Sequence, residues 1–152
     1  QDRFEFEHWA LGLIGARSSH KEKKGSDQGL DGVLFFIDDA NQKAKKVVIQ
    51  VKSGHVQSAV IRDLGHVIER EGAVMGFLVT LELPSGPMER EALAAGFYHS
   101  PGWGRDYPKI QIRTIAEILA GRGVDRPPTN ITLAQADRSR GDEAVQPRLL
   151  SE

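Results

Sequence analysis

Three polar residues early in the sequence have types and spacing that suit chemistry at a phosphate group. Asp31 precedes a short apolar run, and Gln50 and Lys52 end the next one, two positions apart. Residues two apart on a strand face the same way, so pairing of the two runs would bring a carboxylate, an amide oxygen and an ammonium to one sheet end. Hard cations such as Mg²⁺ take oxygen ligands. A lysine beside such an ion can orient a water and balance charge on a phosphorane-like transition state.

A β-hairpin is expected to position these residues. The run Val33–Ile37 is apolar, β-branched and aromatic, which predicts a strand, and Lys46–Val51 predicts its partner after a turn over Asp38–Asn41. Val51 then faces away from the two polar side chains, toward apolar neighbours that would bury it. The preceding stretch, residues 17–31, is polar and rich in glycine and predicts a loop.

Periodicity predicts the elements around this hairpin. Apolar residues recur at helical spacing over residues 4–16, where Trp9 is expected in the core and Gly15 is expected to end the helix. The order of elements predicts a three-layer α/β domain with a mixed central sheet flanked by helices. The other predicted elements are a helix over 56–70, a buried strand over 73–81, a helix over 88–96, a strand over 110–112, and a helix over 115–120 that Thr114 caps and Gly121 ends.

The composition is that of an ordinary globular domain. The chain has 152 residues, of which 39% are hydrophobic and 27% charged, enough to bury one sound core. The sequence has no apolar run of the roughly 18 residues that span a bilayer, no signal peptide and no cysteine, so we expect a cytoplasmic protein without membrane contact. The first residue is Gln1 rather than Met, which is expected of a piece of a longer protein.

Charge and composition vary along the chain. The net charge of −1 argues against a protein that coats nucleic acid non-specifically. Two lysine clusters nevertheless flank the segment that holds the three polar residues. They are expected to be solvated strand ends or contacts to phosphates. The clusters are Lys21, Lys23 and Lys24, and Lys43, Lys45 and Lys46. Few apolar residues follow Asp125, which predicts a domain over 1–124 and a polar C-terminal tail or extension over 125–152.

The segments around the three polar residues resemble a known nuclease family. The sequences Gly-Leu-Asp-Gly over 29–32 and Ile-Gln-Val-Lys-Ser-Gly over 49–54 are similar to the Mrr-type branch of the PD-(D/E)XK nucleases. That branch commonly carries Gln where the superfamily has Asp or Glu. The similarity in element order covers roughly the first 120 residues, and Leu30 stands where the superfamily name has Pro. The resemblance implies the restriction endonuclease-like fold.

The same resemblance implies a divalent-metal-dependent endodeoxyribonuclease that hydrolyses phosphodiester bonds of double-stranded DNA. Lys52 would position the attacking water. Members also tend to have a glutamate of the first helix near the site, and Glu5 and Glu7 both qualify. The implied ligands of Mg²⁺ or Mn²⁺ are Asp31, Gln50 and the backbone carbonyl of Val51.

A narrower likeness concerns the context of the domain. The runs 24–32, 62–64 and 70–73 are similar to nuclease-like domains fused behind DNA methyltransferases. This similarity implies one module of a restriction–modification-type protein. A single active site cuts one strand, so double-strand cleavage would need a homodimer or two binding events.

Other interpretations stay open at the level of sequence. Glutamine in place of an acid removes a negative charge and weakens metal affinity, which favours a catalytically weak or inactive DNA-binding or assembly module on the same fold. A nuclease that resolves DNA junctions is a third option. The loop over 102–104 with Tyr98 and Tyr107 could stack on bases or pack internally. Arg62 and Arg70 could contact the DNA backbone or form salt bridges.

Overall fold

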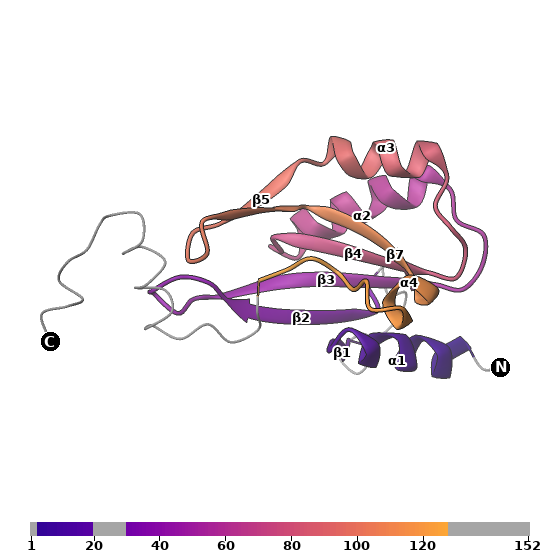
Figure 1. Cartoon of the computed structure of the whole chain (residues 1–152), viewed down its shortest axis with the longest axis horizontal. Helices are drawn as coiled ribbons and strands as arrows, with labels where there is room; N and C mark the ends of the chain where they lie inside the picture. Colours follow the sequence, from indigo (N-terminus) through magenta and orange to yellow (C-terminus); the bar gives the residue numbers. More distant parts are fainter. Residues whose placement is uncertain (1–2, 20–29, 128–152) are drawn as a thin grey trace, which may run out of the picture.

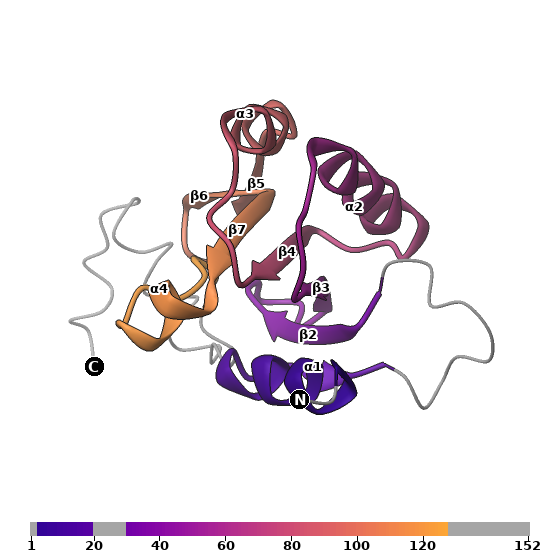
Figure 2. The same cartoon turned by 90° about the vertical axis from the view of Figure 1, so that its right-hand side faces the viewer.

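The protein forms three layers around a five-stranded mixed sheet of order β1-β2-β3-β4-β7. The computed structural model describes residues 3–19 and 30–127. Helix α1 covers one face of the sheet, α2 and α3 lie over the other, and α4 lies beside β7 (Figures 1 and 2). The predicted fold class is confirmed. The elements are α1 (Arg3–Leu13), β1 (Arg17–Ser18), β2 (Gly32–Ile37), β3 (Ala44–Lys52), α2 (Ser58–Arg70), β4 (Met75–Thr80), α3 (Gly86–Ala94), β5 (Phe97–Ser100), β6 (Arg105–Pro108), β7 (Ile110–Thr114) and α4 (Ile115–Leu119).

The predicted hairpin is present and sets the geometry of the sheet. Strands β2 and β3 pair antiparallel, from Gly32 opposite Ile49 to Ile37 opposite Ala44. Strand β3 then pairs parallel to β4, and β4 pairs parallel to β7. The carboxyl ends of these three strands therefore lie at the same edge of the sheet as the beginning of β2.

The side chains of β3 alternate between two cores because successive residues of a strand face opposite ways. Val47, Ile49 and Val51 belong to a buried cluster with residues of α1. Val48 belongs to a second cluster with the buried face of α2. Helix α2 supplies Ile61, Leu64, Val67 and Ile68 to that second cluster. The central strand is thus apolar on both faces along most of its length, as expected for a strand covered by helices on either side.

Helix α1 has a different buried face from the one expected. Trp9 was expected in the core but is 48% exposed, whereas Ala10, Leu11 and Ile14 are buried. Apolar residues on this helix span more than one face, so spacing alone does not decide which arc meets the sheet. Gly15 has a φ of +75°, a conformation that favours glycine, and ends the helix as predicted.

Two strand pairs were not predicted. The short strand β1 lies in the stretch that was expected to be a loop and pairs with the beginning of β2. Strands β5 and β6 form a separate antiparallel hairpin, where the sequence suggested only an aromatic, glycine-rich loop. A strand of two to four residues shows too little alternation to be recognised by periodicity.

The β5–β6 hairpin is anchored to the end of β2 by a buried carboxylate. Asp38 is fully buried. Its Oδ1 accepts a hydrogen bond from Lys45 Nζ at 2.7 Å, and its Oδ2 accepts from the hydroxyls of Tyr98 at 2.6 Å and Ser100 at 2.7 Å. Burial and the adjacent Asp38 raise the pKa of Tyr98 well above its ordinary value. Burial works against the Lys45 ammonium, but its hydrogen bonds to Asp38 and Asp39 outweigh this effect and raise the pKa of Lys45.

The first residue of the predicted C-terminal extension packs against the domain. Asp125 donates its backbone N–H to Gln111 Oε1 at 2.7 Å, and Gln111 Nε2 donates to the Asp125 carbonyl at 2.6 Å. Residues 128–152 lie outside the described residues, so the boundary at 124 stays a prediction. Within the described ranges, none of the helices has the length and apolar character that a membrane crossing needs.

Close packing at Gly32 gives a first testable prediction. A Cβ atom there would lie 2.5 Å from Leu11 Cδ2 and 2.8 Å from the Arg17 carbonyl oxygen. Because a backbone oxygen cannot move without disturbing the β1–β2 pairing, we expect Gly32→Ala to lower the free energy of unfolding by about 1–3 kcal/mol. Urea denaturation followed by circular dichroism measures this change.

Gly65 provides the matched control in the same assay. It lies in α2, and the space that a Cβ atom would enter there is open, so we expect Gly65→Ala to raise the free energy of unfolding by roughly 0.5–1 kcal/mol through helix propensity. Equal urea midpoints for the Gly32 variant and the unmodified protein would contradict the packing argument.

Candidate active site

Asp31 is held immediately before β2 by bonds to β3. Its backbone N–H donates to the Ile49 carbonyl at 2.9 Å, and its carboxylate Oδ2 accepts from the Val51 N–H at 2.8 Å. The residue is 4% exposed. These two bonds lie on either side of Gln50 in the sequence of β3, so Asp31 is fixed next to that residue by local structure.

Gln50 and Lys52 lie on the same face of β3, two residues apart, as the spacing predicted. Gln50 is 7% exposed, and its Oε1 has no hydrogen-bond partner among the described residues. Lys52 is half-buried at the end of the strand. Val51 is buried on the α1 side of the sheet, as predicted. The structure therefore brings Asp31, Gln50 and Lys52 together at one end of the hairpin.

The unpaired Gln50 oxygen is the unusual feature of this cluster. A buried carbonyl oxygen without a donor costs about 1–3 kcal/mol, and such groups in folded proteins commonly indicate an unseen water or ion. In the described part of the chain, no group of three or more His, Cys, Asp or Glu residues is arranged to hold a metal ion. The oxygens that the described cluster itself offers a cation are those of the Asp31 carboxylate, the Gln50 amide and the Val51 carbonyl. This donor set fits Mg²⁺, which is often bound through one or two carboxylates plus waters and substrate phosphates.

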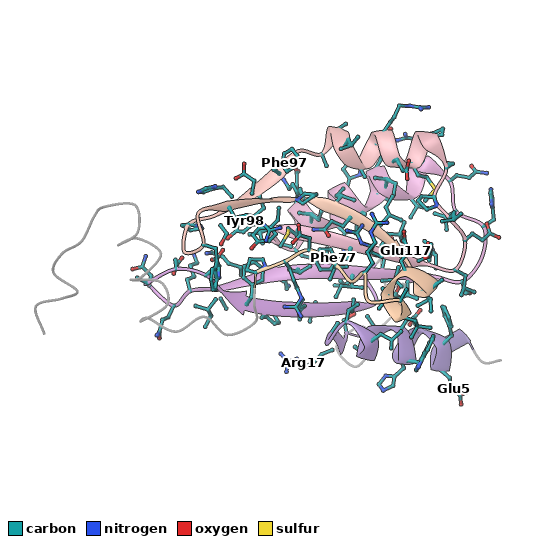
Figure 3. The ribbon with its side chains drawn as sticks, viewed as in Figure 1. Glu5, Arg17, Phe77, Phe97, Tyr98 and Glu117 are labelled. Atoms are coloured by element: carbon teal, nitrogen blue, oxygen red, sulfur yellow. The ribbon has the colours of Figure 1, made fainter. Side chains whose placement is uncertain are left out.

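The two glutamates of α1 that the sequence offered for the site differ in burial. Glu7 is 8% exposed and lies on the sheet-facing side of α1, at helical spacing from Ala10, Leu11 and Ile14. Glu5 is exposed and points away from the sheet (Figure 3). Helix α1 packs on the face opposite Gln50 and Lys52, so Glu7 can approach them only around the end of the sheet.

Other charged and aromatic residues singled out in the sequence have structural partners. Arg62 forms a salt bridge with Glu91 at 2.6 Å, and Arg70 contacts Glu71 at 3.3 Å. Tyr98 is bound to Asp38, as described above. The other residues of this group are placed as follows: Tyr107 is buried in the α1-side core, Lys45 is paired with Asp38 and Asp39, Lys46 is paired with Glu71, and Lys21, Lys23 and Lys24 lie outside the described residues.

The mixed sheet, the flanking helices and the polar cluster at the end of the hairpin define a restriction endonuclease-like domain. The family model described as "NACHT-associated inactive Restriction Endonuclease 1" matches residues 4–120. The chain belongs to this family. Its label states that the family is inactive, which bears directly on the Asp31, Gln50 and Lys52 cluster.

Comparison with other proteins adds one solved structure. The chain is similar to "MspJI Restriction Endonuclease in Complex with 27-mer Oligonucleotide", with 16% sequence identity and a TM-score of 0.47. The similarity covers 99% of this chain and 32% of that chain, so the domain spans about a third of its length. No curated protein matches the chain.

Proposed function

We propose that this domain is a divalent-metal-dependent DNA endonuclease of the Mrr type. The observation that carries the proposal is the buried Gln50 Oε1, which has no protein donor among the described residues and lies in a cluster with Asp31 and Lys52. An inert structural position would be expected to satisfy this oxygen or replace it with an apolar group. A cation-binding position requires it to be free.

The roles of the individual residues follow from their chemistry. Asp31, Gln50 and the Val51 carbonyl would hold Mg²⁺ or Mn²⁺. When bound, the ion supplies Lewis-acid polarisation of the phosphodiester and lowers the pKa of a water. The hydrogen bond from the Val51 N–H fixes the orientation of the Asp31 carboxylate. Lys52, half-buried at the strand end, donates hydrogen bonds that orient the attacking water and offset negative charge developing on the phosphate. Glu7 is the preferred glutamate of α1, because Glu5 faces away.

A second candidate is a nucleic-acid-binding or assembly module that has the fold without turnover. The sparse set of carboxylates favours it, since each missing negative charge weakens affinity for a hard cation, and so does the inactive label of the family. Titration calorimetry with Mn²⁺ in the presence of DNA separates the two functions. Heat of binding that Asp31→Ala abolishes supports the nuclease, and absence of any heat supports the binding module.

The wider context is part of the same proposal. We expect double-stranded DNA as substrate, double-strand cleavage through a homodimer, and a position behind a DNA methyltransferase in a cytoplasmic restriction–modification-type protein. A junction-resolving activity would instead give faster cutting of four-way junctions than of linear duplex, in a direct comparison of the two substrates. The domain of 1–124 and the extension of 125–152 belong to this proposal as well.

Plasmid cleavage tests the function. With Mg²⁺ or Mn²⁺ present, we expect the rate of nicking of supercoiled plasmid to fall roughly 10²–10³-fold in Asp31→Ala and in Lys52→Ala, the size of effect seen when one group that stabilises the transition state is removed. Both losses follow from the proposed roles, in which Asp31 is a metal ligand and Lys52 orients the attacking water.

Two control variants match these changes in charge. Asp63→Ala removes an exposed carboxylate of α2. Lys109→Ala removes a half-buried lysine just before β7, at the opposite end of the parallel strands from Lys52. Both controls should cut as the unmodified protein does. Cutting that is equal in all four variants would refute the assignment.

A further inference from the structure

A cavity lies further along the same hairpin, away from the Asp31 cluster. It has a volume of about 380 Å³, and its lining includes Arg17, Phe35, Lys46 and Glu71. This size is within the range of pockets that bind small ligands or parts of larger ones. None of these residues belongs to the Asp31 cluster, and the proposed cleavage chemistry makes no use of them.

Strand register places this cavity on the same face of the sheet as Gln50 and Lys52. Arg17 is the partner of Val33 across β1 and β2, and Phe35 is the partner of Lys46 across β2 and β3. Directly paired residues share a face. Lys46 and Gln50 are four positions apart on β3, so their side chains also lie on the same face. Asp31 and Phe35 are four residues apart, which is roughly 13 Å along a strand.

The cavity combines an aromatic surface with positive charge. Phe35 is 36% exposed, and the Arg17 guanidinium lies over its ring, 5.9 Å from the centroid. Figure 3 shows the Arg17 side chain at the edge of the molecule, beyond the end of α1. Lys46 and Arg70 both bind Glu71, at 3.0 and 3.3 Å. Among the described residues that line the cavity, the charged ones are the cationic Arg17 and Lys46 and the carboxylate Glu71.

Hydrogen bonds connect the cavity wall to the candidate active site. Ser19, which lines the cavity, donates its hydroxyl to the Leu30 carbonyl at 3.0 Å and its backbone N–H to the Asp31 carbonyl at 3.0 Å. A strand of nucleic acid that passes the Asp31 cluster along this face would therefore meet the Arg17 and Phe35 pair next.

We propose that this cavity holds an unpaired nucleobase of the bound nucleic acid, stacked on Arg17 and Phe35, with Lys46 contacting a neighbouring phosphate. The inference rests on the proposed function in taking nucleic acid as the partner. An aromatic ring inside a cavity reaches the face of a base only when that base is out of the duplex, and both aromatic rings and guanidinium planes are surfaces on which free bases stack. Positive charge at the rim matches the phosphate backbone.

Fluorescence anisotropy tests the proposal, with a labelled oligothymidine and a labelled duplex as probes, in EDTA to prevent cutting. We expect Phe35→Leu and Arg17→Gln each to weaken binding of the single strand by roughly five- to hundredfold, the range typical for loss of one base-stacking contact. The affinity of the same variants for the duplex should fall by a smaller factor than their affinity for the single strand. Matched controls are Phe97→Leu, which changes a ring 62% exposed on β5, and Arg122→Gln, which changes an exposed arginine beyond α4.

The outcomes separate this proposal from the nuclease assignment. Thermal melting shows whether each variant is folded, and Arg17→Gln, at an exposed position, tests the cavity even if Phe35→Leu does not fold. Selective loss of single-strand binding supports the cavity whether or not plasmid is cut. Unchanged single-strand binding by folded variants overturns the cavity proposal, and plasmid cutting by the unmodified protein would then leave the nuclease assignment in place.

Discussion

Replacing Asp38 with alanine is expected to lower the free energy of unfolding by about 3–4 kcal/mol, because a fully buried carboxylate that accepts three hydrogen bonds, one of them from an ammonium, is lost. Asp38 is fully buried and accepts hydrogen bonds from Lys45, Tyr98 and Ser100. The substitution removes the acceptor of the Tyr98 and Ser100 hydroxyls and one of the two carboxylates that bind the Lys45 ammonium, leaving it with Asp39 alone. A domain of this size is stable by about 5–15 kcal/mol, so the loss is a large fraction of the total.

Urea denaturation followed by circular dichroism measures this loss, and Asp106→Ala is the control. Asp106 also binds a basic partner, His99, at 2.7 Å, but the two side chains are 63% and 64% exposed. An exposed pair contributes roughly 0–1 kcal/mol, so its removal should barely move the midpoint. Similar midpoints for the Asp38 and Asp106 variants would show that the buried network does not stabilise the fold.

Asp38→Asn separates charge from shape at this position. The amide oxygen can still accept from one or two of the donors, but the negative charge of Asp38 is lost and Lys45 keeps only that of Asp39. We expect a stability between those of the alanine variant and the unmodified protein. The β5–β6 hairpin should be the first part of the fold to loosen, since the hydroxyls of Tyr98 and Ser100 on β5 bind it to the end of β2.

The contrast between Asp31 and Asp38 shows which side-chain partners can be predicted from sequence. Asp31 directly precedes β2 and its apolar run, and Asp38 directly follows them. The surroundings of Asp31 were predictable because its neighbours come from the partner strand of a short hairpin, where register follows from alternation and turn length. The partners of Asp38 on β5 are separated from it by 60 and 62 residues, and no local pattern relates the two segments. The sequence therefore suggested only a turn.

Helix α1 shows that a helix can be predicted from sequence while the face it buries cannot. Its existence and its end at Gly15 were predictable from spacing and from the glycine, but its rotation about its own axis was not. Phe6, Trp9 and Leu13 compete with Ala10, Leu11 and Ile14 for the sheet, and the last three are the buried ones. Close approach of the helix to Gly32 explains this choice, since Leu11 occupies the space that a side chain at residue 32 would fill. The same rotation buries Glu7 and exposes Glu5.

The Gln50→Glu substitution is expected to strengthen the proposed cation site. The variant adds a second carboxylate beside Asp31, and the number of charged ligands is a main determinant of affinity for hard cations. We expect Mn²⁺ to bind at least about tenfold more tightly, which corresponds to about 1.4 kcal/mol. Without metal the variant should be less stable than the unmodified protein, since two buried carboxylates repel each other and lose solvation.

Thermal unfolding with increasing Mn²⁺, together with titration calorimetry, measures both effects without any need for turnover. An ion that binds only the folded state raises its stability in proportion to the logarithm of concentration over the dissociation constant. Gln111→Glu is the matched control, because Gln111 is 3% exposed and its amide is fully used in bonds to Pro108 and Asp125. Its variant should be destabilised and should show no recovery with Mn²⁺.

Gln50→Leu tests the proposed ligand role of Gln50 by removing its side-chain oxygen. Leucine removes the buried oxygen that has no protein donor among the described residues, and replacing an unsatisfied polar group with an apolar one of similar size is commonly neutral or stabilising. We therefore expect the metal-free leucine variant to be at least as stable as the unmodified protein, but to lose its response to Mn²⁺. These two results together would support a ligand role for Gln50. If the glutamate and leucine variants respond to Mn²⁺ alike, Gln50 is not a ligand and the binding module becomes the better account of this fold.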